Sequence, residues 1–178
     1  MGGYGSALKS AIDVTYSMGF EAPEFPADWP PLLTDELVGR IYAEMTESLD
    51  GTELSIEEIG LKCAPVHFAL KPAIDKAIGT ATLLTLGAVQ YGDDVFFSPN
   101  SLDVDELAHS GNYHVWLTLP SCEIIDLTLT SALYLKKCLS SSAAGRPIIM
   151  HADANPQMHW APLLVGDDMV QQLLSRFS

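Results

Sequence analysis

Cys63 is predicted to begin a helix, a position that can make a thiol reactive. From Cys63 to Ile78, apolar residues recur at the spacing of one helical face, and Gly79 ends the pattern. The first turn of a helix carries unpaired backbone N–H groups and the positive end of the helix dipole, and both stabilise a thiolate. Cys63 is therefore a candidate nucleophile; the alternative interpretation is an inert buried thiol.

A histidine and an aspartate are predicted to meet on a β-hairpin formed by residues 113–129, YHVWLTLPSCEIIDLTL. Two apolar strands flank the turn residues 120–122. With a three-residue loop, His114 and Asp126 become diagonal neighbours on one face, about 7–8 Å apart at the backbone. An imidazole and a carboxylate can bridge that separation with a hydrogen bond.

The two faces of this hairpin differ in composition. The face opposite to His114 and Asp126 is aliphatic: Val115, Leu117, Leu119, Ile125 and Leu127. We therefore expect the aliphatic face to pack on the core and the other face to be polar. Trp116 shares the polar face, where it either shields the histidine–aspartate bond from water or is an ordinary core tryptophan. A three-residue loop usually has Gly at its left-handed position, which here is Cys122, so a five-residue loop of the same parity stays open.

These segments resemble the transglutaminase-like superfamily of papain-like thiol enzymes. The resemblance covers roughly residues 55 to 130: a cysteine opening a helix, then strands, then H114-V-W116 on one strand and I-D126-L-T128 on the next. It departs from the family pattern around the cysteine, where Leu61-Lys62-Cys63-Ala64-Pro65 replaces the usual preceding Gly and following acidic residue.

The resemblance implies a catalytic triad and acyl-transfer chemistry. In that family the cysteine is the nucleophile, the histidine its base and the aspartate the orienting group, which carries over to Cys63, His114 and Asp126. The implied substrate is a peptide, a protein side-chain amide or a small amide or ester, and the reaction is hydrolysis, deamidation or transamidation. One oxyanion donor would be the backbone N–H of Cys63. The alternative function is a non-catalytic acidic binding module on the same fold.

The other histidines are weaker candidates. His67 lies one turn after Cys63 and is the reserve candidate for the base, although a partly exposed helix histidine is the favoured interpretation. His151 and His159, with Asp153 between them, lack a standard metal-ligand spacing, so we expect no bound metal.

Two further polar residues are assigned structural roles. His109 is placed in a polar loop, and Asp167 is interpreted as the N-cap of the last helix. The sequence contains no P-loop and no dinucleotide fingerprint, so no cofactor is implied.

The composition predicts an acidic protein of a reducing compartment. Nine Lys and Arg against 23 Asp and Glu give a net charge of −14, which disfavours nucleic acid and anionic membranes as partners. Three widely spaced cysteines do not form a disulfide framework, and the sequence shows no signal peptide and no apolar run long enough to span a bilayer. We therefore expect a cytoplasmic location.

Helices precede strands along the chain, which indicates an α+β domain with N-terminal helices packed on a mostly antiparallel sheet. Residues 1–33 are interpreted as an arm with a short helix and a proline-rich segment, and residues 34–178 as one domain, transglutaminase-like by the resemblance. Helices are expected at residues 7–18, 34–48, 55–60, 63–78, 130–139 and 168–176, and strands at 80–91, 94–99, 113–119, 123–129, 146–150 and 158–165.

Overall fold

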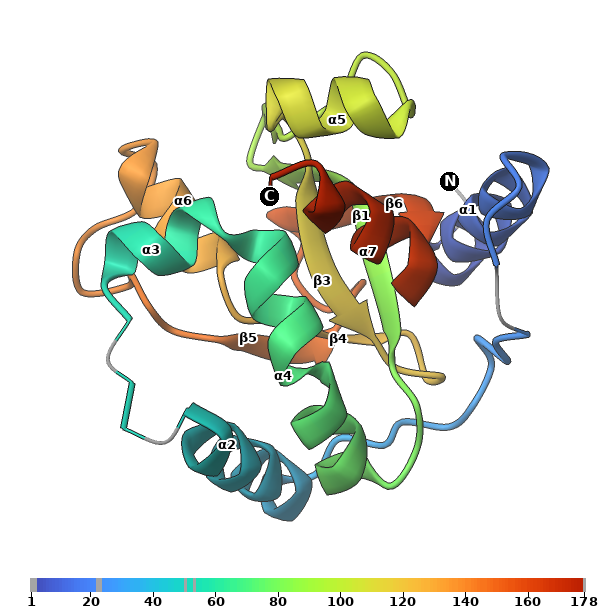
Figure 1. Cartoon of the computed structure of the whole chain (residues 1–178). Helices are drawn as coiled ribbons and strands as arrows, with labels where there is room; N and C mark the ends of the chain where they lie inside the picture. The colour runs from blue at the N-terminus through green and yellow to red at the C-terminus, as the bar shows by residue number, and fades with distance from the viewer. Residues whose placement is uncertain (1–2, 22–23, 50, 53, 178) are drawn as a thin grey trace.

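The computed structural model of the chain describes residues 3–21, 24–49, 51–52 and 54–177, and it has an α+β fold (Figure 1). The helices are α1 (Tyr4–Ser17), α2 (Asp35–Leu49), α3 (Ile56–Leu61), α4 (Cys63–Ile78), α5 (Val104–Ser110), α6 (Leu129–Leu135) and α7 (Asp167–Ser175). The strands are β1 (Leu83–Tyr91), β2 (Asp94–Phe96), β3 (His114–Thr118), β4 (Glu123–Asp126), β5 (Ile148–His151) and β6 (Met158–Val165). No described helix is both long and apolar enough to cross a membrane.

The strands form one antiparallel sheet with β1 at its centre. On one edge of β1, residues 83–87 pair with β3 and residues 89–91 pair with β2, so β6 occupies the other edge. Beyond β3 follow β4 and then β5. The β1–β6 register shifts between Leu86 and Gly87, and a side chain at Gly87 would collide with the backbone of Ala161 and the ring of Trp116. Glycine is required there because β6 approaches β1 so closely.

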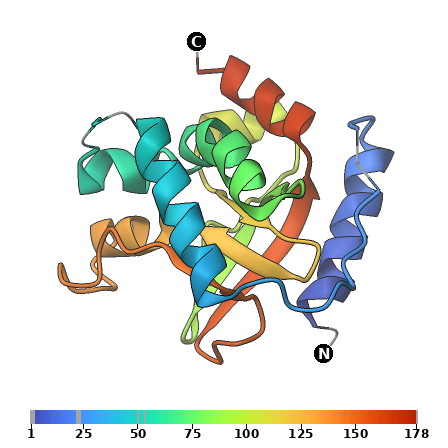
Figure 2. The same ribbon diagram turned by 90° about the horizontal axis from the view of Figure 1, so that it is seen from below.

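Helices cover both faces of the sheet (Figure 1, Figure 2). One core joins the sheet to α2, α4, α5 and α7, and a second core joins it to α1 and α6. The strand β3 alternates between them, because Val115 and Leu117 belong to the first core and Trp116 to the second. The predicted apolar stripes of α2 and α4 face the first core: Leu37, Ile41 and Met45 of α2 and Leu70, Ile74 and Ala77 of α4 are buried.

The β3–β4 hairpin has the predicted three-residue loop. Leu117 pairs with Ile125, and the backbone N–H of Leu119 donates to the carbonyl of Glu123. Cys122 takes the left-handed position with a φ of 60°, although it is not glycine. The five-residue alternative is therefore excluded.

The expectation of a polar, solvent-facing side on this hairpin is wrong. His114, Trp116 and Asp126 are each 0% exposed, like the aliphatic residues on the opposite face. The second face is buried because α1 packs onto it through Tyr4 and Leu8. Sequence alternation identified two faces, but it could not reveal that a second layer covers the polar one.

Two helix assignments also need correction. Residues 104–110, where a loop around His109 was predicted, form α5, which is capped by the Asp103 carboxylate through the backbone N–H groups of Asp105 and Glu106. Asp167 does not cap α7: the N-cap is Gly166, and Asp167 instead forms an ion pair with Lys71, with 3.3 Å between Nζ and Oδ2.

The segment between α1 and α2 has no regular secondary structure in its described residues. Its second half forms hydrogen bonds with the β3–β4 hairpin. The backbone N–H of Trp29 donates to the carbonyl of Pro120, and those of Leu32 and Leu33 donate to the buried Glu123 carboxylate. Residues 22 and 23 of the predicted proline-rich segment lie outside the described residues.

Candidate active site

The structure brings His114 of β3 and Asp126 of β4 into direct contact. His114 Nε2 lies 2.8 Å from Asp126 Oδ2, and neither side chain is exposed. The hairpin register produces this contact, because Trp116 stands opposite Asp126 and His114 is therefore its diagonal neighbour.

Asp126 accepts hydrogen bonds on both of its oxygens. Oδ2 also accepts from Trp160 Nε1 at 3.0 Å, while Oδ1 accepts from the backbone N–H groups of Thr128 and Leu129 at 3.2 and 3.0 Å. Burial raises the pKa of the Asp126 carboxyl, but attraction to His114 and these hydrogen bonds outweigh it and lower that pKa to about 2. The carboxylate therefore stays charged inside the core.

His114 is held as the charged partner of Asp126. Burial lowers the pKa of His114, but Asp126 and then the Cys63 thiol outweigh it and raise that pKa to about 10. The other ring nitrogen, Nδ1, has no hydrogen-bond partner among the described residues. His114 thus donates through Nε2 to Asp126 and has Nδ1 left for a group on the Cys63 side.

Cys63 occupies the first position of α4, as predicted, and is partly buried. The preceding helix α3 begins with the predicted capping box, in which Ser55 and Glu58 satisfy each other's backbone N–H groups. The first backbone N–H groups of an α-helix have no acceptor within the helix, so those at the start of α4 are available as donors near Cys63. The pKa of the Tyr113 phenol is raised, chiefly by burial and to a smaller extent by the nearby Cys63.

His67 is a structural residue, and its assignment as a partly exposed helix histidine is wrong. It is 0% exposed, and both ring nitrogens are used: Nδ1 lies 2.8 Å from the carbonyl oxygen of Cys63, and Nε2 accepts from the backbone N–H of Leu127 at 2.9 Å. Because Nε2 accepts, the proton sits on Nδ1 and donates to Cys63. Burial outweighs the attraction of Asp126 and lowers the pKa of His67 to about 4. The residue joins the start of α4 to the end of β4 and has no nitrogen free to act as a base.

Aromatic rings surround the His114 imidazole. The Trp116 ring centroid lies 6.1 Å away in a stacked arrangement, and the Trp116 N–H is occupied by the hydroxyl of Tyr4. The Phe97 ring lies 5.2 Å away, and the Lys136 ammonium stands 4.8 Å from the Phe97 centroid. Trp116 therefore shields the ion pair from water rather than offering a surface to substrate.

Phe97 and Trp160 are site residues that the sequence analysis missed. Trp160 comes from β6, which reaches the site only through its pairing with β1. Phe97 follows the short strand β2 and has a φ of 56°, which is uncommon for an aromatic residue. No sequence signal distinguishes either from an ordinary apolar strand residue.

The residues considered for a metal site have other roles. Asp153 accepts from the backbone N–H of Tyr4, His151 Nδ1 accepts from the backbone N–H of Asp153, and His159 Nε2 lies 3.1 Å from the carbonyl of Pro156. In the described part of the chain, no three His, Cys, Asp or Glu side chains are grouped to hold a metal ion.

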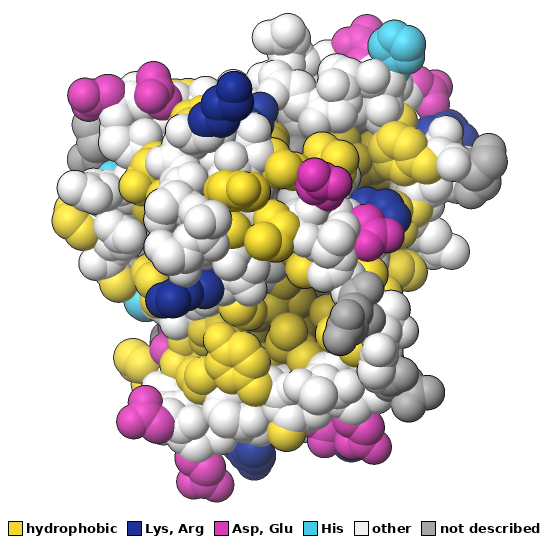
Figure 3. Space-filling model, turned by 90° about the vertical axis from the view of Figure 1, so that its left-hand side faces the viewer, with side chains coloured by type: hydrophobic (Ala, Val, Ile, Leu, Met, Phe, Trp, Pro, Cys, Tyr) yellow, Lys and Arg dark blue, Asp and Glu magenta, His cyan; other side chains and the backbone are white. Residues whose placement is uncertain are grey.

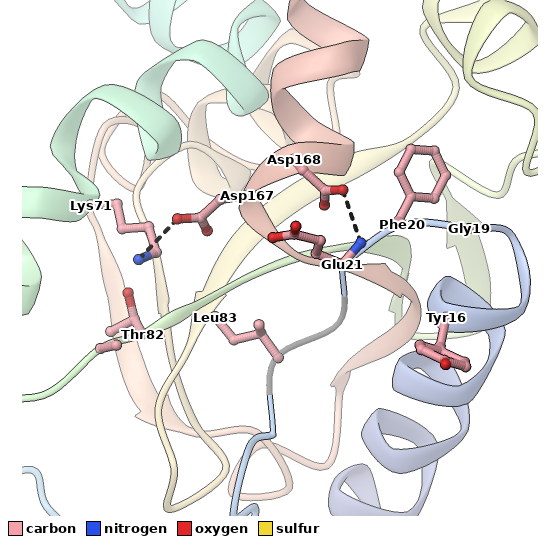
Figure 4. A pocket seen from close by; sticks show the side chains of 10 residues that line it. Tyr16, Gly19, Phe20, Glu21, Lys71, Thr82, Leu83, Asp167 and Asp168 are labelled. Carbon is pink, nitrogen blue, oxygen red and sulfur yellow. Dashed lines mark hydrogen bonds and ion pairs between the residues drawn. The ribbon is translucent and has the colours of Figure 1, made fainter.

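Two surface hollows are not lined by Cys63, His114 or Asp126, although the second includes residues of the helix that begins at Cys63. One of about 600 Å³ lies between the end of α1 and the start of α7, where Lys71 faces Asp167 and the Asp168 carboxylate accepts from the backbone N–H of Glu21 (Figure 4). A second, of about 220 Å³, is lined by the end of α2 and by Pro65, Val66, Ala69 and Leu70 of α4. Apolar side chains also gather in a hollow on the face shown in Figure 3.

Comparisons of the chain with protein-family models, with curated proteins and with solved structures find no match. The functional interpretation therefore rests on the residues of the site and on its geometry.

Proposed function

We propose that the protein is a thiol-dependent acyl-transfer enzyme in which Cys63 is the nucleophile, His114 its acid–base partner and Asp126 the orienting carboxylate. The observation that carries this proposal is the buried His114–Asp126 ion pair. In this pair His114 Nδ1 has no hydrogen-bond partner among the described residues, and the Cys63 thiol contributes to the raised pKa of His114. The order of these residues along the chain, and the H-x-W and D-x-T patterns, support a transglutaminase-like assignment.

The proposed reaction begins with attack of the Cys63 thiolate on an amide or ester carbonyl carbon. The carbonyl oxygen gains negative charge and is stabilised by the backbone N–H of Cys63 at the start of α4. The imidazolium of His114 then gives its Nδ1 proton to the leaving nitrogen or oxygen, which departs and leaves a thioester on Cys63. Asp126 keeps the other nitrogen protonated, so Nδ1 is the atom that exchanges the proton.

The substrate class follows from the same resemblance: a peptide, a protein side-chain amide or a small amide or ester. Cys63, Cys122 and Cys138 are all free thiols, which supports a reducing, cytoplasmic location. The acidic surface favours a neutral or cationic substrate over a polyanion.

A non-catalytic binding module is the second candidate, and one observation favours it. His114 is fully buried, and none of the described hollows is lined by Cys63, His114 or Asp126. A carbonyl substrate would therefore approach Cys63, which is only partly buried, and not the buried His114.

Selective alkylation separates the two candidates. With iodoacetamide at pH 7, we expect Cys63 to react at least about tenfold faster than Cys122 or Cys138, measured by peptide mass spectrometry over time. Cys122 should be slow because burial first, and then nearby Asp153 and Asp28, raise the pKa of its thiol despite Lys9.

The variant His114→Ala serves as the control for that experiment. It should slow alkylation of Cys63 and leave Cys138, which is remote from His114 in the sequence and bonded to the carbonyl of Lys136, unchanged. Equal labelling of all three thiols in the wild-type protein would end the nucleophile assignment and favour the binding module. A panel of acyl probes with mass spectrometry then distinguishes hydrolysis, deamidation and transamidation.

A further inference from the structure

Three buried polar side-chain atoms have no hydrogen-bond partner among the described residues: His114 Nδ1, Thr128 Oγ1 and Ser131 Oγ. All three residues are 0% exposed. Leaving a buried hydroxyl or ring nitrogen unpaired is unfavourable, and such groups in native proteins commonly bind a water molecule or a ligand. The proposed function accounts for His114 Nδ1 but leaves the two hydroxyls unexplained.

The two hydroxyls lie on the same turn of α6. Thr128 is the N-cap residue and Ser131 is the third helical residue, so their side chains are neighbours on one side of the helix. Thr128 does not cap the helix with its hydroxyl, and the Asp126 carboxylate accepts from the N–H groups of Thr128 and Leu129 at the start of α6. The Thr128 hydroxyl is thereby left available for another partner.

The same turn borders His114. The Asp126 carboxylate touches His114 through one oxygen and the backbone N–H of Thr128 through the other. Thr128 follows Asp126 by two residues, just beyond the end of β4, so the turn begins beside the His114–Asp126 pair.

The turn also borders the start of α4. A side chain at Gly60, near the end of α3, would collide with the backbone of Ser131 and Ala132, so α6 packs directly against the segment that leads to Cys63. Leu127 is bonded to His67, whose other nitrogen holds the Cys63 carbonyl. The turn that carries the two hydroxyls is therefore linked to His114 through Asp126, and to Cys63 through Leu127 and His67.

We propose that the hydroxyls of Thr128 and Ser131 bind the water molecule that hydrolyses the Cys63 thioester, so that the acyl acceptor is water rather than an amine. This inference rests on the proposed function. It names the second half of the reaction, which the resemblance alone leaves open between hydrolysis and transamidation.

Hydrolysis of the Cys63 thioester conserves atoms and charge. After acylation, His114 has given its Nδ1 proton to the leaving group and is neutral, so Nδ1 accepts a proton from the bound water. The water oxygen forms a bond to the thioester carbonyl carbon, and the carbon–sulfur bond then breaks. The products are the carboxylic acid, the Cys63 thiolate and the protonated His114, which is the starting state.

The test measures acylation and deacylation separately with p-nitrophenyl acetate as the acyl donor. A stopped-flow burst reports acylation of Cys63, and the steady-state rate after the burst reports hydrolysis of the acetyl-enzyme. We expect Thr128→Val and Ser131→Ala to slow deacylation by at least about tenfold and to change the burst rate by less than about twofold. Hydroxylamine, added as a competing nucleophile, should recover deacylation in both variants, because it does not depend on the bound water.

Thr130→Val is the matched control. Thr130 lies on the same turn, but its hydroxyl already donates to the carbonyl of Arg146 at 2.8 Å, so this variant should leave both rates unchanged. Equal slowing of burst and steady state, or deacylation as fast as in the wild type, would overturn the inference. Absence of both a burst and steady-state turnover that depend on Cys63 in the wild type would instead overturn the proposed function beneath it.

A stability measurement gives a second readout that needs no turnover. If the two hydroxyls bind water, Thr128→Val and Ser131→Ala remove hydrogen bonds and lower the urea midpoint of unfolding. If nothing binds them, removing unpaired polar groups from the core raises the midpoint, and the inference fails.

Discussion

Asp126 accepts hydrogen bonds from four groups of the site. One carboxylate pairs with His114, accepts from the indole of Trp160 and caps the first turn of α6 through the N–H groups of Thr128 and Leu129. A buried carboxylate needs such a full set of donors, because its desolvation is otherwise strongly unfavourable. The residue therefore has a structural and a proposed chemical role at once.

The variant Asp126→Asn should cost both stability and reactivity. An asparagine presents one accepting oxygen and one NH₂ group, so either the His114 and Trp160 donors or the backbone N–H groups lose their acceptor. We expect the free energy of unfolding to fall by about 3 kcal/mol, measured by urea denaturation, and alkylation of Cys63 to slow in the protein that remains folded.

Asp103→Asn is the control for this variant. Asp103 caps α5 in the same way but at the surface, and asparagine caps helices as well as aspartate does. Its stability should change by only a few tenths of a kcal/mol, about the size of an exposed cap substitution. If Asp126→Asn behaved like Asp103→Asn, the buried ion pair would have no energetic importance.

The His114–Asp126 contact was predictable from the sequence because strict alternation along two short strands determines the parity of the hairpin register. The third donor, Trp160, was not predictable. It belongs to β6, 34 residues beyond Asp126, and nothing in the local pattern indicates that β6 pairs with the far edge of β1.

At the scale of elements, the start of α4 is fixed by a side chain rather than by the helix alone. His67 bonds the carbonyl of Cys63 on its own helix and the backbone N–H of Leu127 at the end of β4. This places the first turn of α4, which begins with Cys63, at a set distance from the hairpin. Such a bridge works only while the imidazole is neutral, because Nε2 must accept.

His67 therefore predicts a specific dependence of stability on pH. Its pKa is lowered from an ordinary 6.5 to about 4 in the folded protein, chiefly by burial. As the pH falls from 6.5 toward 4, the unfolded chain takes up this proton and the folded chain does not, so stability is lost by about 3 kcal/mol.

The measurement is urea denaturation at pH values between 7 and 4.5. The pKa of His114 is raised to about 10, so its contribution to stability is fully present below about pH 6 and is lost as the pH rises; it opposes the His67 effect between pH 7 and 6 and adds no slope below pH 6. His67→Gln should flatten the dependence, whereas exposed His109→Gln should keep it. A wild-type slope unaffected by His67→Gln would show that another group titrates.

Elements with strong periodicity or paired caps were predictable, and weaker ones were not. The stripes of α2 and α4 and the capping box of α3 gave those helices correctly. The helix α5 was missed because it has only two buried apolar residues, Val104 and Leu107, in a polar segment. There, capping by Asp103 contributes more than periodicity.

At the scale of the whole molecule, α1 covers the second face of the sheet and excludes water from it. The hydroxyl of Tyr4 bonds Thr118 at 2.6 Å and receives the N–H of Trp116 at 2.7 Å, so one residue of α1 links the helix to the strand that carries His114. Thr85 completes the network through Thr118. Burial raises the pKa of the Tyr4 phenol, so it remains a neutral hydroxyl at all ordinary pH values.

The variant Tyr4→Phe should lower the free energy of unfolding by about 1–3 kcal/mol, because the buried N–H of Trp116 loses its acceptor. Urea denaturation measures this loss. Tyr16→Phe, on the same helix but 76% exposed, is the matched control and should have almost no effect. Equal stability of the two variants would mean that the contact of α1 with the sheet is purely apolar.

The contacts of Asp126 also set an order for folding during synthesis. The neighbouring Leu127 N–H bonds His67 across 60 residues, and Asp126 accepts from Trp160 across 34, so the end of β4 contacts segments that are synthesised at widely separated times. While a nascent chain still lacks β6, β1 has an open edge and Asp126 lacks its indole donor. If Cys63 is the nucleophile that we propose, a ribosome-bound chain that stops short of residue 160 should carry it as an ordinary thiol, and its reactivity should emerge only when β6 pairs with β1.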